Sequence, residues 1–142
     1  MRRIKLPAKD YLSQAYRIDK RINSKIEQVQ SLRSLAVKAA ATLSDMPKSS
    51  NPNHHRLEEI IAKMVDLESE INADLNWLVD LKCEIVTVIK CVESPELQLL
   101  LELRYLCFKT WEQIAVEMNL DLRWIHRLHN RALGEVDDIR HG

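Results

Sequence analysis

The sequence predicts an all-α fold, in which a long antiparallel helical hairpin precedes a small helix-turn-helix domain. Helix-breaking residues are rare, because the 142 residues include only two glycines and four prolines. Apolar side chains recur at steps of three and four residues over two long stretches, and no stretch alternates apolar and polar residues as a half-buried strand would. We therefore expect residues 1–93 to form a coiled-coil-like hairpin and residues 94–142 to form a separate helical domain.

The first long helix is expected over about residues 10–43, a stretch without glycine or proline. Its apolar stripe consists of Ala15, Ile18, Ile22, Val29, Leu32, Ala36, Ala39 and Leu43. Only Lys25 interrupts this stripe, with Ile26 beside it. Such a helix is about 50 Å long, and its narrow stripe needs a partner helix to cover it.

The second long helix is expected over about residues 56–92, after a loop at 44–55 that holds two prolines, several Ser and Asn residues, and His54 and His55. Its stripe consists of Leu57, Ile60, Met64, Leu67, Ile71, Leu75, Leu78, Leu81, Ile85, Val88 and Val92. Further apolar positions widen the stripe, namely Ile61, Val65, Trp77, Val79, Val86 and Ile89. Because two helices alone cannot enclose a core, we expect two chains to pair into a homodimeric helical bundle. The alternative is that the hairpin folds onto the C-terminal helices of its own chain.

Charge is distributed unevenly along a chain whose formal net charge is zero. Residues 1–43 carry ten Lys and Arg against three Asp and Glu, residues 44–93 carry five against ten, and residues 94–142 carry six against eight. The two long helices are therefore electrostatically complementary, which favours packing them side by side. The C-terminal domain is not basic as a whole, which counts against strong DNA binding by a single copy of it.

The C-terminal domain is expected to begin at Ser94, which can cap a helix that has Pro95 in its first turn. A supporting helix over residues 95–108 would turn Leu99, Leu100, Leu103 and Leu106 toward a core. At the other end of the domain, Gly134 is expected to loosen the last helix, leaving a polar tail after Leu133.

Residues 110–133 read as two short helices joined by a tight turn. Thr110 and Gln113 have the spacing of a capping box, Asn119 suits the left-handed end of the first helix, and Asp121 is a good cap for the second. The second helix has an apolar face formed by Ile125, Leu128 and Ala132. This is a helix-turn-helix pattern, although the same turn also occurs in small helical domains that do not bind DNA.

The polar face of the second helix favours DNA binding over a generic helical corner. Its residues are Arg123, His126, Arg127, Asn130 and Arg131. The forked donors of Arg and Asn match guanine and adenine edges or phosphate oxygens, so we expect these residues to contact double-stranded DNA. Trp111 is expected in the core. Trp124 either stacks on a sugar, fills a groove in a partner protein, or folds back on its own domain.

Residues 101–136 resemble region 4 of bacterial primary-type sigma factors. The similar features are LRY at Leu103–Tyr105, the motif Thr-aromatic-Glu-x-Ile-Ala at Thr110–Ala115, and RAL at Arg131–Leu133. The whole chain is similar to small regulators of phages and prophages of low-GC Gram-positive bacteria, the late-gene transcription activators of the RinA/ArpU kind. The chain departs from sigma recognition helices at Leu122 and Trp124, and it has Asn119 where a glycine is familiar.

This resemblance implies a DNA-binding transcription regulator in the cytoplasm of a bacterial host. Because sigma region 4 also docks on RNA polymerase, a polymerase-binding sigma mimic is one alternative. A DNA-packaging accessory of the small-terminase type is another, since such proteins combine a helix-turn-helix with a helical oligomerisation segment.

The sequence offers no convincing catalytic, cofactor or metal site, so we expect no enzyme. The acidic residues of the second helix alternate with its apolar stripe, and a zinc pair of His126 and His129 lacks further ligands, which favours DNA- or water-facing roles for both histidines. Cys83, Cys91 and Cys107 are expected as small core or boundary residues in a reducing compartment. No apolar run reaches the roughly 20 residues that span a membrane.

Overall fold

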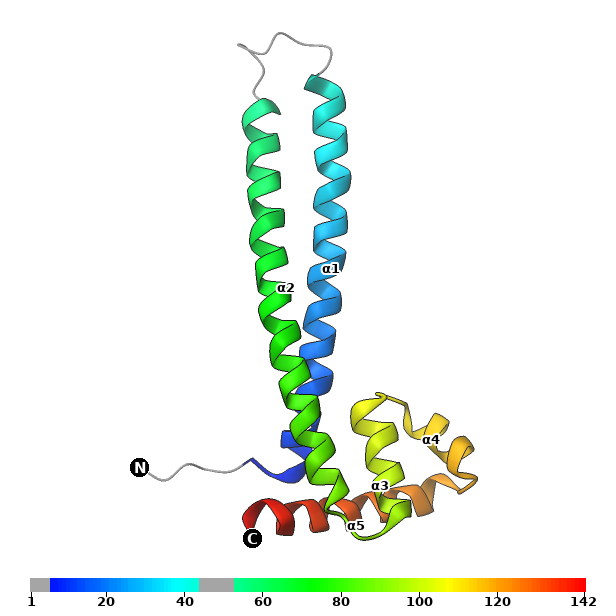
Figure 1. The fold of residues 1–142 in the computed structure, drawn as a ribbon. Helices are drawn as coiled ribbons and strands as arrows, with labels where there is room; N and C mark the ends of the chain where they lie inside the picture. The colour runs from blue at the N-terminus through cyan, green and yellow to red at the C-terminus, as the bar shows by residue number, and fades with distance from the viewer. Residues whose placement is uncertain (1–5, 44–52) are drawn as a thin grey trace. The chain divides into compact units, whose positions relative to one another are not determined.

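The computed structural model describes residues 6–43 and 53–142, and every regular element in these ranges is helical (Figure 1). None of the helices in the described ranges combines the length and apolar character needed to cross a bilayer. The chain forms two compact units. The hairpin unit is Asp19–Trp77, and the terminal unit combines the residues up to Ile18 with Leu78–Gly142. The division therefore differs from the expected boundary at residue 93, because the last turns of the second long helix belong with the C-terminal helices.

The two long helices are α1 (Ala8–Leu43) and α2 (Asn53–Lys90). Helix α1 begins directly after Pro7. Helix α2 begins earlier than expected, and it includes His54 and His55, which the composition placed in a loop. Each histidine lies one turn before a glutamate, His54 before Glu58 and His55 before Glu59, and such pairs support the first turn of an exposed helix. The rest of the expected loop, residues 44–52, lies outside the described residues.

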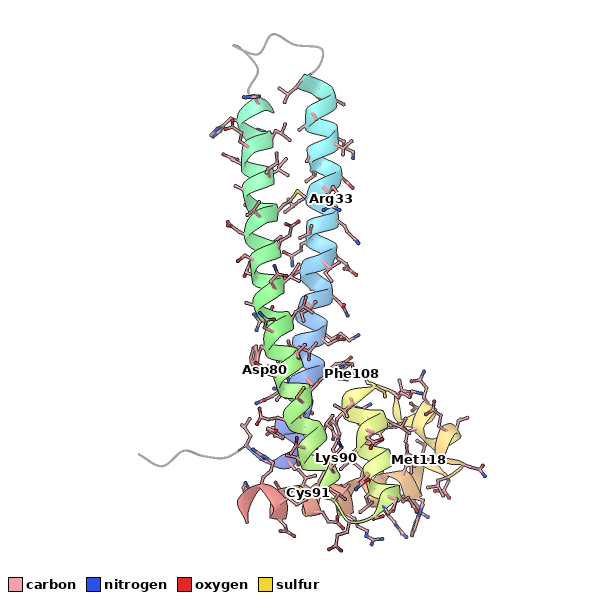
Figure 2. All side chains as sticks on the ribbon, in the orientation of Figure 1. Arg33, Asp80, Lys90, Cys91, Phe108 and Met118 are labelled. Atoms are coloured by element: carbon pink, nitrogen blue, oxygen red, sulfur yellow. The ribbon has the colours of Figure 1, made fainter. Side chains whose placement is uncertain are left out.

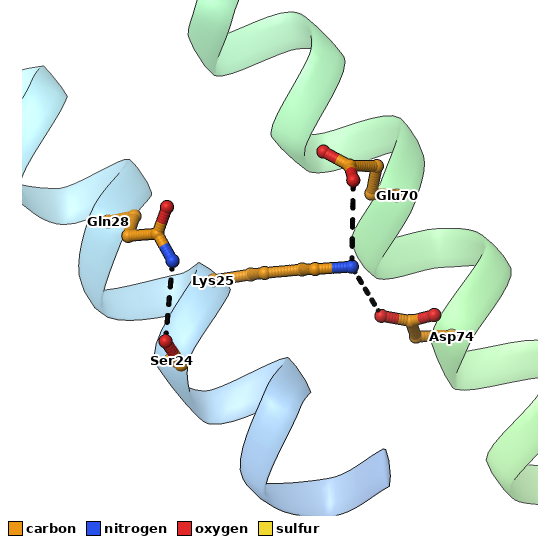
Figure 3. A network of polar contacts seen from close by, with 5 residues as sticks. All are labelled: Ser24, Lys25, Gln28, Glu70 and Asp74. Carbon is orange, nitrogen blue, oxygen red and sulfur yellow. Dashed lines mark hydrogen bonds and ion pairs between the residues drawn. The ribbon is translucent and has the colours of Figure 1, made fainter.

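The inner seam of the hairpin unit contains an ion pair among its apolar side chains. On α1, Ile22 and Val29 are buried, and Lys25 lies between them. On α2, the expected seam residue Leu75 is exposed, and the seam position is taken by Asp74, which is buried. The ammonium of Lys25 lies 2.7 Å from Asp74 and 3.7 Å from the more exposed Glu70 (Figure 3). The lysine that interrupts one stripe is thus neutralised by a carboxylate that interrupts the other.

Most of the buried apolar side chains belong to the terminal unit. Fully buried members include Leu12 of α1, Ile85 of α2, and Leu97, Leu100, Ile114 and Ile125. A hydrogen bond joins the N-terminal and C-terminal segments of this unit. The backbone N–H of Ala8 donates to a carboxylate oxygen of Asp137 at 2.9 Å. In Figure 1 the first turns of α1 lie beside the last turns of α5.

The expected supporting helix 95–108 is divided into α3 (Pro95–Leu101) and a π-helical turn, η2 (Glu102–Leu106). Ser94 caps α3 as predicted, accepting from the N–H of Leu97. A π turn takes more residues per revolution than an α turn, so it shifts which side chains face inward. Of the four leucines expected to face the core, only Leu100 is buried. The other buried residues are Leu97, Leu101 and Tyr105, whereas Leu99 is exposed and Leu103 and Leu106 are half-buried. Leu97–Leu101 precede the π turn, so the turn bears only on the residues after Leu101.

Helix η2 is followed by Phe108 in the left-handed conformation, with φ of 58°. The Phe108 ring (labelled in Figure 2) meets Tyr16 edge-on at 5.6 Å between centroids, and the ammonium of Lys82 lies 4.6 Å from its centre. These contacts offset the roughly 1–2 kcal/mol that this backbone conformation costs an L-residue.

Helices α4 (Trp111–Met118) and α5 (Leu122–His141) complete the terminal unit. The expected polar tail after Leu133 is wrong, because α5 continues through Gly134 to His141. Val136 is fully buried, and the guanidinium of Arg140 donates to the carbonyl of Leu6 at 2.6 Å and lies over the Tyr11 ring. These contacts hold the last turns of the helix in place.

The three cysteines are exposed, contrary to the expectation that they are core or boundary residues. Cys83 lies between the buried Leu81 and Ile85 but faces away from them, and Cys91 follows the last residue of α2 (Figure 2). Cys107 follows η2, where the π turn ends.

Candidate nucleic-acid interface

The start of α4 is fixed by its capping box, as the sequence predicted. The backbone N–H of Thr110 donates to the side-chain oxygen of Gln113 at 2.9 Å, and the backbone N–H of Gln113 donates to the Thr110 hydroxyl at 3.2 Å. Two backbone donors that the helix cannot satisfy are thus paired reciprocally. The direction of α4 is set at its first residue.

The turn between α4 and α5 is equally well defined. Asn119 ends α4 in the left-handed conformation, with φ 56° and ψ 45°, which is the role the sequence predicted. The N–H of the next residue, Leu120, donates to the Ala115 carbonyl at 3.0 Å. The carboxylate of Asp121 then accepts from the N–H of Trp124 at 2.7 Å and caps α5. Three residues therefore reverse the chain without leaving a helix end unsatisfied.

The first half of α5 has a buried face and an exposed arginine-rich face. Ile125, Leu128 and Ala132 are buried, as predicted. On the opposite side lies what we call the arginine ridge, whose members are Arg123, Arg127, Asn130 and Arg131. All four are exposed, and in the part of the chain that the structure describes no ion pair involves the three arginines. Their charge is therefore available to an external anion.

His126 and His129 have different environments, which corrects the expectation that both face outward. His126 is exposed, and its ring packs against Trp111 at 5.1 Å between centroids. His129 is buried, and Trp111 contacts its ring edge-on at 4.5 Å. Among the described residues, no group of three or more His, Cys, Asp or Glu side chains could hold a metal ion.

Buried His129 forms a hydrogen bond of 2.5 Å between its Nε2 atom and the hydroxyl of Tyr105 in η2. Burial, together with the smaller effect of the charges of Lys9, Arg104 and His126, lowers the pKa of His129 to about 4. Burial also raises the pKa of Tyr105 to about 12. At neutral pH a neutral Nε2 therefore accepts from a neutral phenol.

Arg104 and Trp111 extend this cluster toward the surface. The Arg104 guanidinium lies 4.4 Å from the centre of the Trp111 ring, and it donates to the Lys109 carbonyl at 2.9 Å. Trp111 is half-buried, so it packs against its neighbours but does not lie in the core as expected. The cluster thus joins η2, α4 and α5, and it fixes the rotation of α5 about its own axis.

Sequence reasoning missed His129, although a signal was present. His129 precedes the buried Ala132 by three residues and Val136 by seven, which is the spacing of a helical face. A histidine on an apolar face is usually a satisfied core residue. What the sequence could not show is the partner, because the π turn decides where Tyr105 points.

Exposed apolar side chains lie around the turn. Val116 of α4 is 80% exposed, and at the start of α5 Leu122 and Trp124 are 40% and 41% exposed. A shallow hollow beside them is lined by Ala115, Val116, Asn119, Leu120 and Asp121. Trp124 is therefore not folded back into its own domain.

These elements present one outward ridge on a rigid helix, with a small apolar surface at its N-terminal end. Compared with known proteins, the chain matches no family model, no curated protein and no solved structure.

Proposed function

We propose that the protein is a sequence-specific DNA-binding transcription regulator, in which α4 and α5 form a helix-turn-helix and α5 is the recognition helix. The observation that carries this proposal is the arginine ridge, in which three arginines and one asparagine lie on the exposed face of a helix whose other face is core. None of the three arginines forms an ion pair with another of the residues that the structure describes. A helix of this kind fits the major groove of B-DNA, where its first turns meet base edges.

Individual roles follow from position along α5. Among the ridge residues, Arg123 and Arg127 lie closest to the N-terminus of α5. They would read bases, most simply guanine through paired hydrogen bonds. His126 and Asn130 would assist from the neighbouring positions, and Arg131 would bind a phosphate. Trp124 lies beside Arg123 and would contact a sugar or a thymine methyl group.

The resemblance to sigma region 4 and to phage late-gene regulators supports the same assignment. The residues that carry it now have structural roles consistent with it: Tyr105 of the LRY motif anchors His129, and Thr110 caps α4. We propose that the protein acts in the cytoplasm of a bacterial host that carries the phage or prophage. The coiled-coil-like hairpin would serve this function as an oligomerisation segment.

The proposal is tested by selecting duplexes from a random library with the full-length protein, and then measuring affinity by fluorescence anisotropy. Replacing Arg123 and Arg127 together by alanine is expected to weaken binding to the selected duplex by about a hundredfold or more, because each base contact contributes about 1–3 kcal/mol. A matched control removes the same charge elsewhere, by Arg17→Ala with Arg21→Ala, since both of these arginines are exposed on α1.

Two results would contradict DNA readout by α5. One is unchanged affinity of the Arg123→Ala, Arg127→Ala variant for the selected duplex. The other is an equal loss in the α1 control, which would indicate unspecific attraction to phosphate. Affinity is also expected to fall steeply as salt rises from 50 to about 200 mM, and Arg131→Ala should lower the slope of that dependence.

The exposed apolar side chains Val116, Leu122 and Trp124 favour a second candidate function, a contact with RNA polymerase. DNA readout gives no role to Val116, because it lies on α4 rather than on the recognition helix. Co-purification of polymerase with the protein, lost in Val116→Lys while duplex affinity is retained, would support this contact. Retention of polymerase by that variant would exclude Val116 from it.

A further inference from the structure

The hairpin unit lacks an enclosed core of its own. Among its described residues, the only buried apolar side chains are Ile22 and Val29, and the remaining seam residues are half-buried. Two helices packed along one seam leave their outer faces in water, and hairpins of this kind are stabilised when further helices cover those faces.

One face of the hairpin unit carries exposed apolar side chains from both helices. The ion pair between Arg33 of α1 and Glu68 of α2, 3.9 Å apart, marks this face and sets its register. Ile26 lies two helical turns before Arg33, and Leu75 lies two turns after Glu68. Because the two helices are antiparallel, Ile26 and Leu75 lie level with each other. Val37 and Val65 are likewise level on the other side of the ion pair.

Together with Ile61, these residues form what we call the outer apolar face, whose members are Ile26, Val37, Ile61, Val65 and Leu75. All five are exposed large hydrophobic side chains. On α2 the steps between Ile61, Val65, Glu68 and Leu75 are four, three and seven residues, which is the heptad spacing of a second packing seam.

The opposite face of the hairpin unit is mixed in character. A groove there is lined by five polar or charged residues, Gln28, Ser31, Lys63, Asp66 and Glu70, together with Leu32 and Leu67, and its lining surface is more apolar than polar. Leu35 is the exposed large hydrophobic residue of α1 on this side. Trp77 of α2, which is 50% exposed, also lies on this side, seven residues after Glu70. The opposite face thus carries two exposed large hydrophobic residues, fewer than the five described above.

We propose that the outer apolar face binds the same face of a second copy, and that the two hairpins form an antiparallel four-helix bundle. Charge favours a second copy as the occupant. The α1 part of the unit, residues 19–43, carries five Lys and Arg against two Asp and Glu, whereas the α2 part, residues 53–77, carries two against six. Each helix is thus complementary to the other helix of an identical hairpin.

The same charges select one of two possible symmetries. If the two-fold axis runs parallel to the helices, α1 of one copy faces α2 of the other, and every neighbouring pair is antiparallel and oppositely charged. If the axis runs across the helices, α1 faces α1 and like charges meet, which disfavours that arrangement. The bundle therefore has the Trp77 ends of both hairpins at the same end.

The mass of the full-length protein in solution tests the interface. Light scattering at micromolar concentration is expected to give twice the mass of one chain for the parent. Ile61→Lys, at a position 48% exposed, is expected to give a single chain, and Val65→Lys should do the same. Leu35→Lys is the matched control, because Leu35 is 47% exposed but lies on the opposite face, and it should remain dimeric.

Circular dichroism of each variant separates a lost interface from a lost fold. A folded monomer for Ile61→Lys supports the proposal. If Ile61→Lys unfolds instead, the mass of Val65→Lys provides the test. A helical dimer for Val65→Lys would overturn the proposed face. A monomeric parent, or equal dissociation by Leu35→Lys, overturns it as well.

The symmetry is tested by one spin label at Arg56→Cys, near the loop end of α2, after the exposed Cys83, Cys91 and Cys107 are changed to serine. With the axis parallel to the helices, the two labels lie at one end of the bundle, about 20–30 Å apart. With the axis across the helices they lie near opposite ends, on the order of 40 Å apart at 1.5 Å rise per residue. The longer distance would overturn the proposed arrangement.

Discussion

His129 shows how one side chain connects α5 to the rest of the terminal unit. Its imidazole is buried, hydrogen-bonded to Tyr105 and in edge-on contact with Trp111. The arginine ridge lies on the other side of the same helix. Any change that charges or displaces His129 therefore alters the angle at which the ridge is presented.

The lowered pKa of His129 predicts loss of stability in mild acid. Between its folded pKa of about 4 and its ordinary value of 6.5, the unfolded chain binds a proton that the folded chain does not. The contribution of neutral His129 to the free energy of unfolding is thus complete above pH 6.5, and it is lost as the pH falls toward 4. Between pH 7.5 and 5 the loss is roughly 2 kcal/mol, at 1.36 kcal/mol per pKa unit.

Urea unfolding of the parent and of His129→Gln at both pH values measures this effect. The glutamine variant is expected to lose less stability over the interval, because it has no imidazole to protonate. His126→Gln, which removes an exposed imidazole from the same helix, is the control. Equal pH dependence in the parent and in His129→Gln would refute the prediction.

Gly134 lies on the exposed face of α5, one turn after the ridge, and a Cβ atom added there meets nothing within 4 Å. Gly134→Ala is therefore expected to raise the free energy of unfolding by about 0.5–1 kcal/mol, since glycine is a poor residue for a helix interior. Thermal or urea unfolding measures this change. If stability rises while affinity for the selected duplex falls, the bare backbone at Gly134 approaches the DNA; a fall in stability would contradict the prediction.

Local capping could be predicted from the sequence at single-residue resolution. Thr110, Gln113, Asn119 and Asp121 form the bonds or conformations their types and spacing indicate, because each depends only on neighbours within a few positions. The burial of His129 and the exposure of the cysteines could not be predicted in this way. They depend on how distant elements rotate against one another.

At the scale of helices, Lys25 and Asp74 fix the register between α1 and α2. A slip by one heptad would leave both charges facing apolar side chains, whereas the apolar seam alone would tolerate it. The sequence showed that Lys25 interrupts a stripe. It did not show that Asp74, rather than Leu75, occupies the facing position, because both fit a spacing of three and four.

A double-mutant cycle tests this role. Lys25→Met alone leaves the buried Asp74 carboxylate unpaired, and it is expected to lower the free energy of unfolding by about 3 kcal/mol. Lys25→Met combined with Asp74→Leu should restore it to within about 1 kcal/mol of the parent. If the pair were not coupled, the losses of stability measured for Lys25→Met alone and for Asp74→Leu alone would simply add in the double variant. Chemical denaturation of the three variants distinguishes these outcomes.

The π turn η2 is the element that periodicity could not predict. It inserts its extra residue between a well-capped α3 and the left-handed Phe108, and it turns Tyr105 toward His129. A sequence read at 3.6 residues per turn therefore assigns the right residues to a helix, and Leu100 to its buried face, but it gives no sign of the π turn, in which Leu103 and Leu106 are only half-buried.

At the scale of the whole molecule, each chain contributes one pair of helices α4 and α5, and a dimer would contribute two. If both proposals hold, selected duplexes will contain two half-sites related by a dyad. Ile61→Lys is then expected to weaken binding to the full site far more than to a single half-site. Anisotropy titrations with both duplexes measure this difference. An equal effect on both duplexes would show that dimerisation does not contribute to DNA binding.

The all-helical class and the two long helices could be predicted from composition and spacing. The division into two units could not be predicted in this way, because Leu78–Lys90 continues the same apolar stripe that runs through the hairpin. Periodicity shows that a helix has an apolar face. It does not show which other helix covers that face.

The terminal unit closes through a hydrogen bond between Ala8 and Asp137, residues 129 positions apart. During translation the first turns of α1 leave the ribosome long before the last turns of α5 exist. A polypeptide that stops at Leu133 would retain Arg123, Arg127 and Arg131, yet it would lack Val136, Asp137 and Arg140, which hold the opening turns of α1. A prematurely terminated product is therefore expected to expose its apolar side chains to cellular proteases.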